Sequence, residues 1–90
     1  MVRLHIDIRG RVQGVGFRWS AVEEARRLRL TGWVRNTLEG GVEAVVEGER
    51  AVVDRFLEWC HRGPRMAHVD AVREREEAAT GEFESFEIRA

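Results

Sequence analysis

Residues 2–18 read VRLHIDIRGRVQGVGFR and hold the clearest strand of the chain together with the turn into the first helix. In the first half of this stretch, apolar side chains alternate with charged or polar ones, and the apolar positions are Val2, Leu4, Ile6 and Ile8. A repeat of two residues predicts a β-strand with one buried face and one face toward water. The glycines that follow, beginning at Gly10, indicate that the strand ends in a loop.

Two later segments have a helical pattern. From about Trp19 to Leu30 the apolar residues recur at helical spacing, which predicts a first helix with Arg26, Arg27 and Arg29 in its last turn. A second helix is predicted beyond Gly48, because the apolar residues there follow an i, i+3, i+4, i+7 stripe, namely Val53, Phe56, Leu57 and Cys60. Gly63 and Pro64 predict its end.

The remaining segments are extended. Trp33–Thr37 and Val42–Glu47 are short β-favouring runs joined by a connection that contains glycine, so an antiparallel pair is expected. Alternation returns from Ala67 to Arg73, with Ala67, Val69 and Ala71 expected on one side. A charged loop is predicted from Arg75 to Gly81, and Phe86 with Ile88 form a last extended piece.

The predicted order is therefore β-α-β-β-α-β plus a short C-terminal strand. This order is typical of the ferredoxin-like, or split βαβ, arrangement within the α+β class. Both helices are expected on one face of a mixed or antiparallel sheet, which leaves the charged side of the first strand toward water. A chain of 90 residues supports one core, so residues 1–90 are expected to form a single domain. Because this fold carries enzymes, RNA binders and regulatory domains, the site must indicate the function.

Composition excludes several classes of protein. All 15 cationic residues are arginine, against 16 acidic residues, so the net charge is −1 and a nucleic-acid partner is not expected. The absence of lysine excludes a phosphate loop that ends in Gly-Lys-Ser/Thr. Cys60 is the only cysteine, which excludes an internal disulfide and a metal site built on several cysteines. No apolar run has membrane-spanning length and no targeting segment is visible, so a cytoplasmic protein without a membrane partner is expected.

The loop between the first strand and the first helix is a candidate anion site. Residues 10–18 read GRVQGVGFR, and glycines allow successive backbone N–H groups to converge on one point. Arg18 falls at the start of the helix, where the dipole disfavours a cation unless an anion lies between the two. The predicted phosphate-binding loop comprises Gln13, Gly14, Val15, Gly16, Phe17 and Arg18. The alternative is a tight turn beside a solvated Arg18.

Asn36 is the second candidate. It lies near the end of the segment that contains Trp33, and a side-chain amide with a donor and an acceptor can hold a water molecule in a fixed direction. An equally simple interpretation is that Asn36 only begins the hairpin. Both interpretations are open at this point.

Together the two segments resemble the acylphosphatase family, whose members hydrolyse the carboxyl–phosphate bond of acyl phosphates. The first segment matches the family pattern G-x-V-Q-G-V-x-F-R through residues 10–18, and the second matches its glycine–aromatic–small–basic–Asn start through residues 32–36. The resemblance implies that Arg18 binds the substrate phosphate, that Asn36 orients the attacking water, and that no metal or organic cofactor is needed. It also implies a small acyl phosphate as substrate and inorganic phosphate as product.

The chemistry implied by this resemblance needs few groups. The leaving group is a carboxylate, whose conjugate acid has a pKa of about 4, so it departs without a protonating acid. What remains is to stabilise charge on the phosphoryl oxygens and to place water in line. Neither motif contains a general base, so we expect the phosphate to accept the proton of the water. A monomer is expected.

Other polar residues and other functions compete with this interpretation. The histidines, at positions 5, 61 and 68, are expected to lie on the surface, and Cys60 in the core. Asp7, Glu39 and Glu43 share no spacing that suggests a carboxylate pair or a metal site. An RNA-binding domain is disfavoured because Val2–Arg9 and Val42–Glu47 contain no aromatic residue. A non-catalytic anion-binding domain and a structural assembly subunit stay open as functions.

Overall fold

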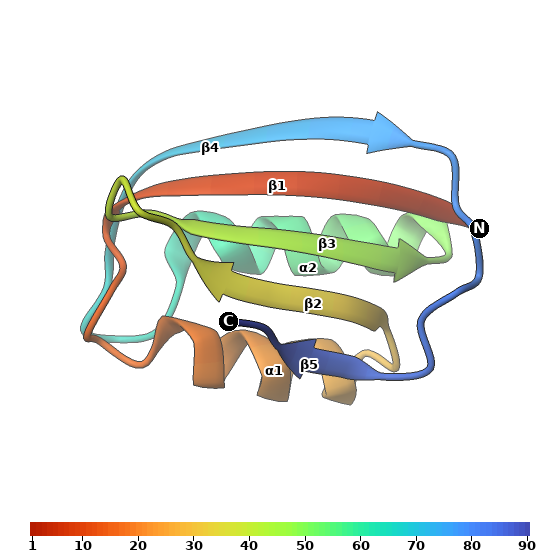
Figure 1. Ribbon diagram of the computed structural model, residues 1–90, viewed down its shortest axis with the longest axis horizontal. Coiled ribbons are helices and arrows are strands. Elements are labelled where there is room, and N and C mark those ends of the chain that lie inside the picture. Colours follow the sequence, from red (N-terminus) through yellow and green to blue (C-terminus); the bar gives the residue numbers. More distant parts are fainter.

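The helices of this protein cover one face of a five-stranded sheet and leave the other face open (Figure 1). The computed structural model describes residues 1–90. In chain order its elements are β1 (Val2–Arg11), α1 (Phe17–Arg27), β2 (Thr31–Asn36), β3 (Val42–Gly48), α2 (Arg50–Arg62), β4 (His68–Glu77) and β5 (Phe86–Ile88). The strands lie in the order β4-β1-β3-β2-β5, and only the β2–β5 pair is parallel. The predicted ferredoxin-like α+β fold with a terminal extra strand is confirmed.

The alternation of β1 separates the two faces of the sheet as predicted. Leu4, Ile6 and Ile8 are each 2% exposed or less, and they lie on the face that the helices cover. They pair across β3 with Val46, Ala44 and Val42, which are equally buried. The apolar stripe of α2 closes the core from the other side with Val53, Phe56 and Cys60. The core therefore lies between the two layers.

Helix α1 begins two residues earlier than predicted and ends three residues earlier. It begins at Phe17 because that side chain is 1% exposed and belongs to the core. It ends at Arg27 because Arg29 adopts a left-handed conformation with φ 60°, which lets Leu30 N–H donate to the carbonyl of Ala25 at 2.9 Å. The prediction that placed Arg29 in the last helical turn was therefore wrong.

Strand β4 differs from its prediction in length and in phase. It continues to Glu77, through part of the segment expected to be a loop, because it pairs with β1 as far as Arg3. The register shifts between Arg9 and Gly10, whose partners are Ala71 and Val69. This bulge moves Ala71 to the exposed side, so it does not share the half-buried side of Val69 as expected.

The topology brings two segments that are distant in the sequence to the same end of the sheet, where β1 and β2 both end. Strands β1 and β2 both pair antiparallel with β3, so their C-terminal ends point the same way. The glycine loop follows β1, and Asn36 is the last residue of β2. The glycine loop and the C-terminal end of β2 both lie at the left of the sheet in Figure 1, beside the start of α1. Neither helix is long and apolar enough to cross a membrane.

Candidate functional site

The glycine loop presents a run of backbone N–H groups that have no partner within the chain. From Gln13 to Arg18, none of these groups donates to a backbone or side-chain acceptor, and the first helical bond comes from Ser20 to the carbonyl of Gly16 at 3.0 Å. Gly14 and Gly16 have φ 74° and 80°, a left-handed conformation that other residues adopt at a cost. Successive free N–H groups beside a helix N-terminus make a concave site for an anion.

Apolar side chains anchor this loop at both ends. Val12 and Phe17 are each 1% exposed, and the Phe17 ring packs against Trp59 of α2 with centroids 5.2 Å apart. Val15 is half-buried and packs against the same core. The side chains of Val12 and Phe17 therefore hold the two ends of the loop, and Val15 packs against the core between them.

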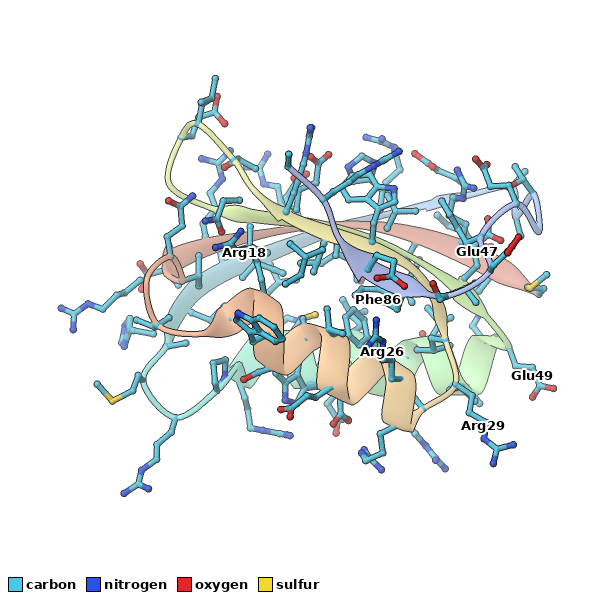
Figure 2. The ribbon with its side chains drawn as sticks, turned by 60° about the horizontal axis from the view of Figure 1, so that its bottom comes forward. Arg18, Arg26, Arg29, Glu47, Glu49 and Phe86 are labelled. Carbon is cyan, nitrogen blue, oxygen red and sulfur yellow. The ribbon has the colours of Figure 1, made fainter.

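The side chain of Arg18 has no anionic partner in the protein. It makes no ion pair and no side-chain hydrogen bond, whereas other arginines of the chain do, namely Arg3, Arg26, Arg27, Arg35, Arg50 and Arg75. It is half-buried, and Figure 2 shows it rising from the first turn of α1 toward the sheet. No acidic residue lies in that turn. A guanidinium at the positive end of a helix, without a neutralising carboxylate, attracts an anion.

Asn36 lies on the helix-covered side of the sheet at the same edge. It has the same strand parity as Val34, which is fully buried, and it pairs with Val42. Its Oδ1 atom is buried and has no hydrogen-bond partner. Such an atom is rare in a folded protein and marks a place where a donor from outside the chain belongs. Asn36 therefore keeps unused hydrogen-bonding capacity at the end of the sheet that carries the glycine loop.

The hairpin after Asn36 is closed by its neighbour. Thr37 N–H donates to the carbonyl of Gly41 at 2.9 Å, and Gly41 N–H donates to Thr37 Oγ1 at 3.0 Å. The side chain of Asn36 takes no part in these bonds. Thr37 therefore forms the hydrogen bonds that close the hairpin, and the side-chain amide of Asn36 is not used for this.

The side chain of Gln13 joins the two halves of the site. Its Nε2 group donates to the carbonyls of Thr37 and Gly41, both at 2.8 Å. Sequence reasoning placed Gln13 in the phosphate-binding loop, and the structure uses its side chain to hold that loop against the β2–β3 hairpin. Gln13 is the only glutamine of the chain, and no local pattern in the sequence predicts this contact.

The largest hollow of the molecule does not fit phosphate. It lies beside Asn36 on the open face of the sheet and is lined by Asp7, Arg35, Asn36, Thr37, Leu38, Glu39, Glu43 and Ala90. Its carboxylates would repel a phosphate, and Arg18 is not part of it. The glycine loop is therefore the better candidate site.

The remaining reactive side chains lie elsewhere. His61 and His68 are exposed as predicted, whereas His5 is half-buried on the open face of the sheet. Cys60 is fully buried, and burial raises the pKa of its thiol far above the ordinary range, so it is an inert core residue.

The fold and this end of the sheet define a small α+β protein with a candidate anion-binding loop between its first strand and first helix. The acylphosphatase family model matches residues 4–88 of the chain. The chain belongs to the acylphosphatase family and is an enzyme of that family, which confirms the resemblance seen in the two sequence segments.

Individual relatives agree over nearly the whole chain. The acylphosphatase of Anaeromyxobacter dehalogenans is 53% identical over 98% of this chain and 95% of its own length. The crystal structure of acylphosphatase from Bacillus subtilis superposes with a TM-score of 0.96 at 33% identity and covers both chains completely. HypF from T. kodakarensis contains a similar unit, with a TM-score of 0.85 at 32% identity over all of this chain but 12% of that chain.

Proposed function

We propose that this protein hydrolyses the carboxyl–phosphate bond of small acyl phosphates to a carboxylate and inorganic phosphate, without a metal or organic cofactor. The observation that carries the proposal is the set of free N–H groups from Gln13 to Arg18 beside the unpaired Arg18 guanidinium. In this proposal residues 1–90 form one domain, and the protein is monomeric and cytoplasmic.

The loop and Arg18 bind the phosphoryl group in this proposal. The backbone N–H groups hold phosphoryl oxygens, and the planar guanidinium of Arg18 can contact two of these oxygens at once. Because phosphoryl transfer is mainly a matter of position and charge, these fixed donors stabilise the transition state as charge spreads over the equatorial oxygens. The leaving carboxylate needs no proton, because the pKa of its conjugate acid is about 4.

Asn36 places the attacking water in this proposal. Its side-chain amide, which has no partner at Oδ1 within the chain, turns to hold the water by a hydrogen bond and so fixes the direction of attack. An amide does not take up a proton at neutral pH, so the water proton passes to a phosphoryl oxygen. A pH–rate profile that requires an enzyme base with a pKa near 6 to 7 would count against this step.

Nucleic acid is not a partner in this proposal. Trp33 of β2 is half-buried on the open face of the sheet, where an aromatic ring could stack on a base. Two arginine side chains already contact this ring. The guanidinium of Arg89 lies 4.6 Å from its ring centroid and that of Arg35 lies 5.4 Å away. A base would have to displace these contacts before it could stack.

The second candidate function is a non-catalytic anion-binding unit. A similar unit makes up 12% of HypF from T. kodakarensis, so this fold also occurs as a part of a larger protein. Such a unit would bind phosphate at the loop and would not turn over an acyl phosphate.

Hydrolysis of benzoyl phosphate in excess chelator tests the proposal. We compare the parent with Arg18→Ala, Asn36→Ala and, as a matched loss of one exposed positive charge, Arg65→Ala. The parent and Arg65→Ala should turn over, whereas folded Asn36→Ala should bind phosphate and be inactive. Folded Arg18→Ala should lose both properties. If the folded parent binds phosphate and hydrolyses nothing, the anion-binding alternative replaces the proposal.

A further inference from the structure

A cluster of potential metal ligands lies on the open face of the sheet, away from the glycine loop. His5 and Asp7 are alternate residues of β1, and Glu43 of β3 is the direct cross-strand partner of Asp7. All three are half-buried, and one ligand atom from each can be chosen so that these atoms lie within 4.8 Å of one another. The cluster is independent of the proposed hydrolysis, because its side chains point to the face opposite the helices.

The charges in this cluster are incompletely balanced. Asp7 makes no hydrogen bond and no ion pair, although it directly faces a second carboxylate, a placement that normally destabilises a sheet. Two groups, Arg35 and His5, are in hydrogen-bond contact with Glu43. Arg73 is the neighbour of Asp7 on β4, yet the two form no ion pair.

We propose that His5, Asp7 and Glu43 bind a divalent transition-metal ion of the Zn²⁺ class. The ligand atoms are Nε2 of His5 and one carboxylate oxygen each from Asp7 and Glu43. Imidazole with carboxylate is a donor set that suits zinc and its neighbours in the first transition row. Three protein ligands leave the remaining coordination positions to water.

Neighbouring groups orient these ligands in the way that metal sites require. Arg35 Nε donates to Oε1 of Glu43 at 2.6 Å, which leaves Oε2 directed at His5 Nε2. On the other side of the imidazole, Oε2 of Glu77 lies 3.5 Å from Nδ1. A carboxylate behind a ligating histidine fixes its tautomer and raises its basicity.

Metal binding exchanges one proton position in the histidine. In the structure His5 Nε2 is in hydrogen-bond contact with Oε2 of Glu43, and Nδ1 lies 3.2 Å from a guanidinium nitrogen of Arg75. The ion takes the place of the proton on Nε2, and the neutral ring then carries its proton on Nδ1, toward Glu77. Arg75 keeps its own bond to Glu77 at 2.9 Å.

The local charge is close to balanced. Arg35 offsets Glu43, Arg75 offsets Glu77, and Arg73 lies opposite Asp7 on β4 without forming an ion pair with it, so Asp7 is the carboxylate free to meet a cation. A nearly neutral site with three ligands is expected to bind less tightly than a closed structural zinc site.

The experiment measures metal uptake by the chain after treatment with chelator and dialysis. Zn²⁺ is titrated calorimetrically and Co²⁺ by its visible absorption. The matched control is Asp70→Asn, because Asp70 lies 3.1 Å from His68 on β4 as an exposed pair without a third ligand. We expect one saturable site in the parent and in the control, and at least about tenfold weaker binding in Asp7→Asn.

A second measurement separates metal binding from folding. Asp7→Asn is isosteric and removes the repulsion from Glu43, so it should be as stable as the parent without metal or more stable. Zn²⁺ should raise the melting temperature of the parent but not that of Asp7→Asn. If the folded parent takes up no Co²⁺, or if Asp7→Asn binds as tightly as the parent, the proposal is wrong.

Discussion

At the scale of single residues, the surroundings of the site residues depend on segments that are distant in the sequence. The motif positions of Arg18 and Asn36 could be found in the sequence, because the glycine spacing marks the first and Asn36 is the only asparagine of the chain. That the Asn36 oxygen is buried without a partner could not be found, because it depends on β2, β3 and the helix layer together. The grouping of Asp7 with Glu43 was missed for the same reason, since pairing between strands far apart in sequence sets it.

Gln13 provides a prediction at this scale. Its two hydrogen bonds to Thr37 and Gly41 hold the glycine loop against the strand end that carries Asn36. If both halves of the proposed site must keep their relative position, Gln13→Ala should lower kcat by about tenfold to a hundredfold, because small misplacements of positioned groups are costly. Phosphate binding should change much less, since the loop N–H groups and Arg18 remain.

The control for Gln13→Ala is a variant that also loses two side-chain hydrogen bonds, but far from the loop. Arg27→Ala removes its bonds to Glu24 on the exposed side of α1, and it should leave both kcat and phosphate binding unchanged. Steady-state kinetics and phosphate titration on folded variants show whether Gln13 positions the loop against Asn36 or supports the loop itself. Equal losses of phosphate affinity and kcat in Gln13→Ala would show that Gln13 supports the loop itself and does not position it against Asn36.

At the scale of elements, periodicity predicted every helix and strand but not all of their ends. The stripe of α2 and the alternation of β1 are long and regular, so burial follows them closely. The end of α1 could not be predicted, because Arg29 occupies a left-handed position that usually belongs to glycine. The phase of β4 changes at a bulge opposite Gly10, where an added Cβ would collide with the β4 backbone at His68 and Asp70.

Arg29 allows a test of how α1 ends. A non-glycine residue in the left-handed region costs roughly 1 kcal/mol, so Arg29→Gly should be more stable than Arg29→Ala by about that amount. Both variants lose the same charge, which removes the helix dipole from the comparison. At Arg27, the last residue of α1, the order should reverse, with alanine more stable than glycine by up to about 1 kcal/mol. Urea unfolding of the four variants gives the comparison. The same order at both positions would contradict a left-handed end at Arg29.

At the scale of the whole molecule, one buried carboxylate fastens the segment that crosses from β4 to β5. Glu47 of β3 is 1% exposed and accepts the N–H groups of Thr80 and Gly81, each at 3.0 Å, and Nε of Arg3 at 2.7 Å. In Figure 2, Glu47 and Phe86 lie near the two ends of the last stretch leading into β5. Phe86 is fully buried, and its ring packs against Phe56 with centroids 5.5 Å apart. A polar and an apolar anchor together hold the last strand parallel to β2.

This carboxylate should make the stability of the whole fold depend on pH. Burial opposes the charge of Glu47, but the hydrogen bonds from Thr80, Arg3 and Gly81 outweigh it and lower its pKa from the ordinary 4.5. A folded-state pKa below the unfolded one means that the stabilisation is complete above about pH 5 and is lost as the pH falls through the folded-state pKa.

Glu47→Gln should therefore cost roughly 3 kcal/mol at pH 7 and clearly less at pH 3. Urea unfolding at both pH values tests this, with Glu84→Gln, an exposed residue without an ion pair, as the control. A Glu47→Gln penalty that is the same at pH 3 as at pH 7 would show that the shape of the side chain, and not its charge, fastens the crossing segment.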